Sequence, residues 1–286
     1  TGFAMLAETN VQEVMDLGAV AHLASIEGRV PFINFFDGFR TSHEIQKVAI
    51  WDYEDLKEMT NMEAVAEFRK HSLNPERPAM RGSHENDDIF FQHREACNKY
   101  YTALPAVVEK YMAKVNEKLG TNYQLFNYYG AADADRVIVA MGSICDVAEE
   151  VIDYLNAHGE KVGLIKVRLY RPFAPEKLVA AIRQVQPEVI VTQDEKGEYG
   201  HGAHRACVDG CKQAILDAAD TTKYRDSAKE YGVWQTKKLY LHLYKENQRR
   251  FDWHVPLAAF DGKDGLTIAT EALAFHKSQT LGGWEM

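Results

Sequence analysis

The sequence predicts an α/β fold with parallel, Rossmann-like sheet layers and helices on both faces. The main observation is an alternation after residue 136: apolar strands at 137–141, 163–169 and 188–192, separated by helices at 146–157 and 175–185. Strands separated by helices of this length favour parallel pairing through right-handed crossovers. The second observation is size, because 286 residues, 46% of them hydrophobic, are enough for two domains with a core each.

The first elements of the chain follow from local signals. Asn10 precedes an amphipathic run and Glu13 follows three residues later, which predicts a capped helix start. Residues 30–36 are apolar and aromatic, so they are expected to form a buried strand that ends in a turn at Asp37. Thr41 opens an S/T-x-x-E pattern that is typical of a short helix.

Loop and helix signals divide the rest of the chain. Residues 74–88 are rich in Pro, Gly and polar side chains and are expected to form a surface loop. A helix is predicted from Pro105, which suits a first helical position, to a stop at Gly120. After the alternating region, the pattern predicts a helix at 201–219, a strand at 239–244 and a final helix at 266–276.

Composition excludes several classes of partner. The formal net charge is −9 and the basic residues are scattered, so no stripe of Lys and Arg is present for binding nucleic acid. No apolar run approaches the roughly 20 residues that cross a bilayer. The first residues lack the basic and apolar regions of a signal peptide, so we expect a cytoplasmic protein.

The four cysteines are too few and too scattered for a disulfide framework. Cys207 and Cys211 lie four residues apart on a predicted helix, so they share one face and could bind a metal. Free cysteine is most often a small buried residue, and this second interpretation is favoured here.

Eight segments of the first 173 residues form an ordered pattern: residues 1–7, 11–14, 35–44, 81–82, 100–101, 125–128, 136–143 and 167–173. Together they resemble the pyruvate:ferredoxin (flavodoxin) oxidoreductase family. The resemblance implies that residues 1–120 are part of the pyrimidine-side thiamine domain. It also implies that residues 121–179 are part of a transketolase-C-terminal-like domain.

In the intact family, thiamine diphosphate serves the decarboxylation of pyruvate, iron–sulfur clusters carry electrons to ferredoxin or flavodoxin, and acetyl-CoA is made. The resemblance implies that the activating glutamate and the pyruvate-binding arginine lie upstream of Thr1. It also implies that the cluster cysteines and the diphosphate-binding domain have no counterpart in this sequence. We therefore expect a partial enzyme that is inactive alone, with missing domains or subunits as partners and a homo-oligomer as one alternative.

Within this region the turn after the predicted strand is a candidate ligand site. Asp37, Arg40 and Thr41 are candidates for cofactor binding, because α/β sheets place ligand groups where strands end. The favoured alternative is that Arg40 and Glu44 pair with other domains and that Thr41 caps a helix. Gly142-Ser143 could similarly meet a phosphate or simply begin a helix.

A second set of segments lies in the last 107 residues: residues 187–194, 197–205, 237–244, 247–248, 253, 255–257 and 276–279. Together they resemble the LmbE-like (PIG-L) zinc de-N-acetylases. The resemblance covers residues 180–286 and implies that His204 is a zinc ligand. It also implies that His201 stabilises the tetrahedral intermediate or protonates the amine of an N-acetylated sugar.

The implied zinc site is incomplete. The first motif of that family, of the form A-H-P-D-D-E, is not found, and one histidine is short of the three protein ligands that a catalytic zinc normally has. Three hypotheses therefore stand: a partial oxidoreductase, a de-N-acetylase, and an inert α/β scaffold or chimeric fusion. A join between residues 173 and 185 would also leave apolar surface exposed in each half.

Overall fold

The computed structural model describes residues 2–38, 40–78, 85–196, 200, 202–250 and 252–274. The chain divides into two compact units, Thr1–Leu243 and Tyr244–Met286. The second unit contains η1 (Ala258–Phe260) and α11 (Gly265–Leu273). Both sheets belong to the first unit.

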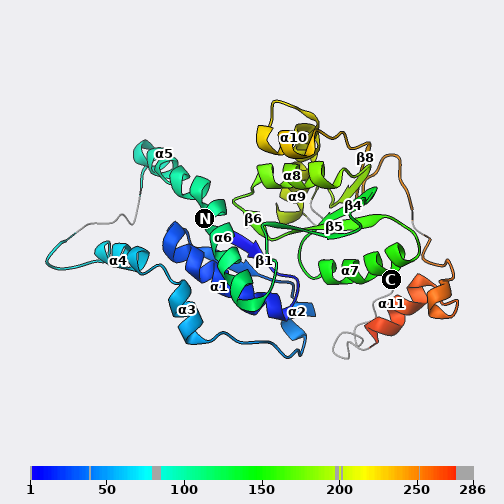
Figure 1. Ribbon diagram of the computed structural model, residues 1–286, viewed down its shortest axis with the longest axis horizontal. Helices are drawn as coiled ribbons and strands as arrows, with labels where there is room; N and C mark the ends of the chain where they lie inside the picture. Colours follow the sequence, from blue (N-terminus) through cyan, green and yellow to red (C-terminus); the bar gives the residue numbers. More distant parts are fainter. Residues whose placement is uncertain are drawn as a thin grey trace. The chain divides into compact units, whose positions relative to one another are not determined.

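The first sheet has three strands in the order β2-β1-β6 (Figure 1). Strands β1 (Ala4–Ala7) and β2 (Phe32–Phe35) are parallel, and helix α1 (Val11–Gly28) connects them. Strand β6 (Leu169–Arg171) is antiparallel to β1 and arrives from much later in the chain. The β1–α1–β2 unit is the parallel crossover that alternating apolar segments predict.

Helix α1 begins as its sequence predicts. The side chain of Asn10 accepts a hydrogen bond of 3.0 Å from the amide of Glu13. The helix packs closely against α6 (Asn98–Leu119), and a Cβ on Gly28 would approach Leu104 Cδ1 to 2.4 Å. The predicted start of this second helix was wrong, because Pro105 lies inside α6 rather than at its first position. Buried Leu104 and the tyrosines before it pack against the core and extend the helix backwards.

Four short helices lie between the first strand pair and α6. They are α2 (Arg40–His43), α3 (Tyr53–Met59), α4 (Met62–Lys70) and α5 (Asp87–Ala96). Thr41 lies within α2 and does not cap it. Among the described residues α4 and α5 bury no side chain fully, which explains why no core-facing pattern predicted them.

The second sheet has five strands in the order β3-β5-β4-β7-β8. The strands are β3 (Phe126–Gly130), β4 (Arg136–Ala140), β5 (Val162–Val167), β7 (Val189–Thr192) and β8 (Lys238–Leu241). Strand β3 is antiparallel to β5, and the other pairs are parallel.

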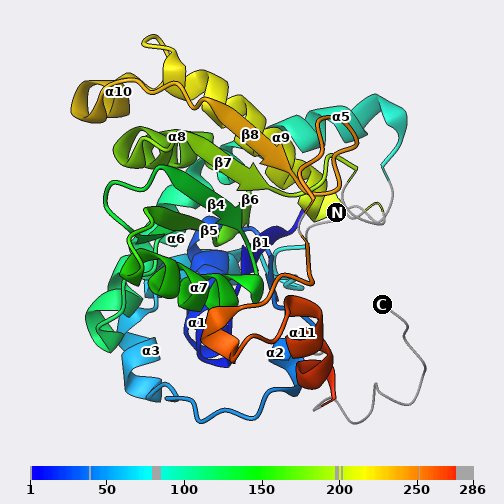
Figure 2. The ribbon, with the colours of Figure 1, turned by 90° about the vertical axis from the view of Figure 1, so that its right-hand side faces the viewer.

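Helices lie on both faces of the second sheet (Figure 2). Helix α7 (Ile144–Ala157) lies on one side, and α8 (Pro175–Val185) and α9 (Gly202–Ala219) lie on the other. The predicted α/β class with a parallel sheet and helices on both faces is confirmed. None of the helices in the described ranges is long and apolar enough to cross a membrane.

One predicted strand belongs to two sheets. Residues 163–169 were expected to form a single strand, but β5 ends at Val167 and β6 begins at Leu169. Arg168 lies between them, where the chain passes from the second sheet into the first. The apolar pattern did not show where the strand breaks, because Val167 and Leu169 on either side of Arg168 are both buried.

Arg183 of α8 fixes the end of α9 through backbone carbonyl groups. This fully buried side chain donates to the carbonyls of Asp217 (2.9 Å), Ala218 (3.1 Å), Asp220 (2.8 Å), Lys223 (3.1 Å) and Tyr224 (2.9 Å). Terminal carbonyls carry the negative end of the helix dipole, so they stabilise a cation. Arg183 therefore orders the turn that leads into α10 (Arg225–Tyr231).

We predict that Arg183→Lys lowers the free energy of unfolding by about 2 kcal/mol, because lysine cannot reproduce the planar fork of donors. Urea unfolding followed by circular dichroism measures this change. Arg225→Lys, at an exposed position of α10, is the matched control and should change stability by less than about 0.5 kcal/mol. Equal effects of the two substitutions would contradict the role assigned to Arg183.

Candidate functional site

Polar side chains gather where the parallel strands of the two sheets end. Glu8 follows β1, Asp37 lies two residues after β2, Ser143 precedes α7 after β4, and Arg168 follows β5. The two sheets meet here, since the amide of Ala7 donates to the carbonyl of Arg168 at 2.8 Å. Carboxyl ends of strands are where α/β proteins hold ligands. We call Glu8, Glu13, Asp37, Ser143 and Arg168 the strand-end cluster.

A buried ion pair lies at the centre of the strand-end cluster. Both terminal nitrogens of Arg168 donate to the carboxylate of Glu13, with Nη2 2.8 Å from Oε1, and the two side chains are 4% and 8% exposed. The amide of Thr9 also donates to Glu13 at 2.9 Å, and Arg168 Nε donates to Asn127 at 2.7 Å. Burial alone would raise the pKa of Glu13, but Arg168 and Thr9 hold this pKa below its usual value.

Glu8 is a second buried carboxyl group beside this pair. It has no exposed surface, and neither carboxyl oxygen has a hydrogen-bond partner among the residues that the structure describes. Burial and the neighbouring Glu13 carboxylate raise the pKa of Glu8 to about 9, although Arg168 opposes the shift. Glu8 is therefore protonated at neutral pH.

The polar network continues from the ion pair into α1 and the segment before β3. The hydroxyl of Tyr123 donates to Asp16 at 2.7 Å, and Gln12 donates to the other Asp16 oxygen at 2.8 Å. The guanidinium of Arg168 lies 5.0 Å from the centroid of the Tyr123 ring. Burial and the bond to Asp16 raise the pKa of Tyr123, so this hydroxyl remains a donor.

The structure places Asp37 against the start of α7. Its carboxylate accepts a hydrogen bond from the amide of Ser143. Gly142 has a positive φ of 83°, and a Cβ there would approach Asp37 Oδ2 to 2.7 Å. The Asp37 side chain thus occupies the amide of Ser143, which the sequence had suggested as a phosphate-binding group. Binding of a cofactor by Asp37 stays a prediction.

The other predicted cofactor residues have different surroundings. Arg40 is exposed in α2. Thr41 is buried, and its hydroxyl has no hydrogen-bond partner in the described part of the chain. The structure therefore brings Asp37 alone of the three into the strand-end cluster.

The two predicted histidines cannot be placed in a site. His201 lies outside the described residues, and His204 lies in α9 with a side chain outside them. Cys207 and Cys211 are buried on the same helix and free, with Cys211 Sγ 3.8 Å from Thr192 Oγ1. Within the described ranges, no three His, Cys, Asp or Glu side chains cluster in a way that could hold a metal ion.

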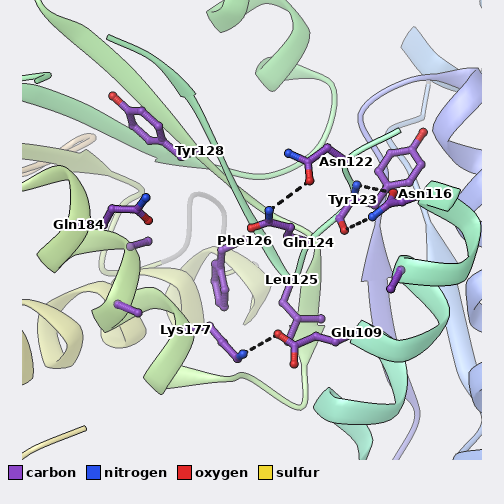
Figure 3. A pocket seen from close by; sticks show the side chains of 13 residues that line it. Glu109, Asn116, Asn122, Tyr123, Gln124, Leu125, Phe126, Tyr128, Lys177 and Gln184 are labelled. Atoms are coloured by element: carbon purple, nitrogen blue, oxygen red, sulfur yellow. Dashed lines mark hydrogen bonds and ion pairs between the residues drawn. The ribbon is translucent and has the colours of Figure 1, made fainter. Parts of the chain in front are cut away.

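A pocket of about 380 Å³ lies apart from the strand-end cluster, between α6, β3 and α8 (Figure 3). Lys177 and Glu109 form an ion pair of 2.7 Å across one side of it. Asn116 donates to the carbonyl of Tyr123 at 2.9 Å and accepts from its amide at 2.7 Å. The polar groups of these four residues are thus already paired with one another.

The central residues of the site were missed at the level of sequence. Glu13 was interpreted only as part of a helix start, and Glu8 was not considered. One available signal was Arg168, a charged residue inside the apolar run 163–169. Buried charges are rare unless they are paired, so a charge at such a position predicts a buried partner.

Comparison with known families gives two matches in order along the chain. Residues 1–113 match the family described as pyruvate flavodoxin/ferredoxin oxidoreductase, thiamine diphosphate-binding. Residues 134–219 match pyruvate:ferredoxin oxidoreductase core domain II. The first predicted resemblance is confirmed by these matches.

Individual relatives agree with the family matches. Pyruvate-flavodoxin oxidoreductase of Enterobacter agglomerans is 62% identical over 174 residues, 61% of this chain and 15% of the relative. The Klebsiella pneumoniae protein of that name is 54% identical over 73% of the chain and 18% of its own length. The Rhodospirillum rubrum protein is 41% identical over 87% of the chain and 22% of its own length. The chain thus spans about a fifth of these relatives or less.

A solved structure of 2-oxoglutarate:ferredoxin oxidoreductase from Magnetococcus marinus is also similar. The likeness covers 83% of this chain and 38% of that chain, with a TM-score of 0.40 and 15% identity.

The predicted change of family near residue 180 is wrong. The core domain II match runs without a break across the expected join between 173 and 185 and continues to residue 219. The Rhodospirillum alignment covers a share of the chain that must include β8. The sheet is continuous across the same region, since β4 pairs with both β5 and β7. No match supports a de-N-acetylase or a zinc site for residues 180–286.

Proposed function

We propose that this chain is part of a pyruvate oxidoreductase that passes electrons to flavodoxin or ferredoxin, and that it contributes a portion of the thiamine diphosphate-binding domain together with core domain II. The observation that carries the proposal is the ordered pair of family matches at 1–113 and 134–219. Relatives with up to 62% identity carry that activity in their names. Residues 1–120 are then the pyrimidine-domain portion.

The strand-end cluster gives this proposal a structural basis. Glu13 belongs to the thiamine-domain match and Arg168 to the core domain II match, so their ion pair joins the two regions. The contact between Asp37 and the start of α7 joins them a second time. We infer that the cluster fixes the orientation of one domain on the other, which an active site built from several domains requires.

The cluster itself does not fit a diphosphate. Three of its members, Glu8, Glu13 and Asp37, are carboxyl groups, and its single cation is already paired with Glu13. The cysteines do not fit iron–sulfur ligation, because a cluster is held by several thiolates together and no three Cys, His, Asp or Glu side chains gather among the described residues. Thiamine diphosphate, coenzyme A and the clusters would therefore act in the complete enzyme, and we propose that this chain alone does not oxidise pyruvate.

Replacing a segment of a relative tests the proposal. In the Enterobacter agglomerans enzyme, the stretch that aligns with this chain is exchanged for the chain's own residues, so that both partners of the ion pair are exchanged together. We expect pyruvate- and CoA-dependent flavodoxin reduction within about tenfold of the parent rate, equivalent to a barrier change of about 1.4 kcal/mol or less.

The control exchanges only the part that matches residues 1–113. In this hybrid, Glu13 comes from this chain, and the residue that takes the place of Arg168 comes from the parent enzyme. A folded, cofactor-loaded hybrid with no pyruvate oxidation in the full exchange would overturn the proposal. Pyruvate oxidation by the isolated chain would contradict its dependence on the missing domains.

A further inference from the structure

Within the unit Thr1–Leu243, helices cover only half of one face of the second sheet. Strand register places Leu164, Ile138, Val191 and Tyr240 in one row across β5, β4, β7 and β8. Helix α7 packs over β5 and β3, and Leu164 beneath it is fully buried. Ile138 and Val191, by contrast, are 39% and 37% exposed, although β4 and β7 are interior strands.

The opposite face of the same strands is closed. Val137, Val139 and Ile190 are at most 1% exposed beneath α8 and α9. Parallel sheets are normally covered on both faces, because their strands are apolar on both sides. An interior parallel strand with an exposed Ile or Val on one side therefore indicates a layer that another segment supplies.

Helix α7 presents a second apolar surface. Ile144, Val147, Val151 and Tyr154 follow a spacing of three, four and three residues and are 52%, 43%, 50% and 47% exposed. These positions form one stripe beside the sheet-facing positions of the helix. In a right-handed β4–α7–β5 crossover, this stripe turns toward β4 and β7 rather than toward β3. We call Ile138, Val191, Ile144, Val147, Val151 and Tyr154 the open face.

The dimensions of the open face suit one helix. Strands β4, β7 and β8 span about 10 Å across the sheet, which is the diameter of an α-helix with its side chains. The stripe on α7 is about 15 Å long, or three helical turns. The carboxylates of α7 lie on its other flank, because Glu149 pairs with Lys166 of β5 and Asp153 accepts from Tyr129 of β3. The stripe itself is apolar, so a helix lying beside it would bind through apolar side chains.

The length of the relatives indicates where such a helix comes from. This chain spans 15% to 22% of the relatives compared above, so most of an oxidoreductase polypeptide lies outside it. We propose that the open face is the docking surface of an amphipathic helix from that remaining polypeptide. This inference rests on the proposed function.

Thiol labelling tests the docking surface. Val151→Cys is introduced into the isolated chain and into the segment-exchanged enzyme, and the rate of iodoacetamide modification is followed by mass spectrometry of the α7 peptide. Cys145 in the same peptide does not interfere, because it is buried and burial raises its pKa to about 12. Asp153→Cys, on the exposed flank of α7 that faces β3, is the matched control.

We expect modification of Val151→Cys to slow by about tenfold or more in the active exchanged enzyme, with little change for Asp153→Cys. Equal rates for Val151→Cys in the two proteins would overturn the inference, and activity of the exchanged enzyme would still support the proposed function. Equal slowing at Asp153→Cys would also overturn it, since a larger surface would then cover the whole helix. If modification of Val151→Cys in the isolated chain slows as the concentration of that chain rises, a second copy covers the open face, and this result would also overturn the inference.

Discussion

Replacing Arg168 by methionine is expected to lower the free energy of unfolding by about 3–5 kcal/mol. The substitution leaves the Glu13 carboxylate buried at 8% exposure beside the buried Glu8, with the Thr9 amide still donating to it. An uncompensated buried charge costs far more than the pair contributes. Urea unfolding at neutral pH, followed by circular dichroism, measures the loss.

Two comparisons isolate the cause of this loss. Arg136→Met removes an arginine that pairs with Glu160 and Asp135 at the surface, and it should cost less than about 1 kcal/mol. Adding Glu13→Gln to Arg168→Met should recover part of the stability, because the orphaned carboxylate is removed. A double variant that is less stable than Arg168→Met alone would contradict this explanation.

Glu8→Gln is expected to stabilise the chain by about 3 kcal/mol at pH 7. The pKa of Glu8 is raised from 4.5 to about 9 on folding, so the folded chain holds a proton that the unfolded chain releases. Below pH 4.5 the carboxyl is protonated in both states and contributes no pH dependence. Between pH 4.5 and about 9, stability falls as the pH rises, because only the unfolded state loses the proton.

The measurement is the difference in unfolding free energy between Glu8→Gln and the parent chain across this pH window. The difference should be near zero at pH 4 and should grow with pH up to pH 7. Asp153→Asn, at an exposed carboxylate of α7, serves as the control and should show no comparable growth. A constant difference at all pH values would show that Glu8 is not a buried neutral acid.

Local signals in the sequence were sufficient for many of the elements. Pro175 at a first helical position and an apolar stripe gave the bounds of α8, and Asn10 gave the start of α1. These features depend on neighbours within four residues in the chain, so the sequence contains them directly. The α/β class followed in the same way from alternating segments after residue 136.

In the last third of the chain, the resemblance of short segments to a known family gave a wrong prediction. The short Gly- and His-rich segment around His201 and His204 pointed to a zinc hydrolase, but the core domain II match includes it. A short motif is informative only in the structural context that it requires, and here the surrounding strands and helices continue the sheet that begins before the motif.

Only the tertiary structure decided the features that depend on contacts distant in the chain. The break at Arg168, its ion pair with Glu13 155 residues away, and the neutral state of Glu8 all arise where two sheets meet. The half-covered face at Ile138 and Val191 likewise depends on strand order. Sequence periodicity tells which side chains are apolar, but burial, pairing and proton affinity are set by neighbours that only folding brings together.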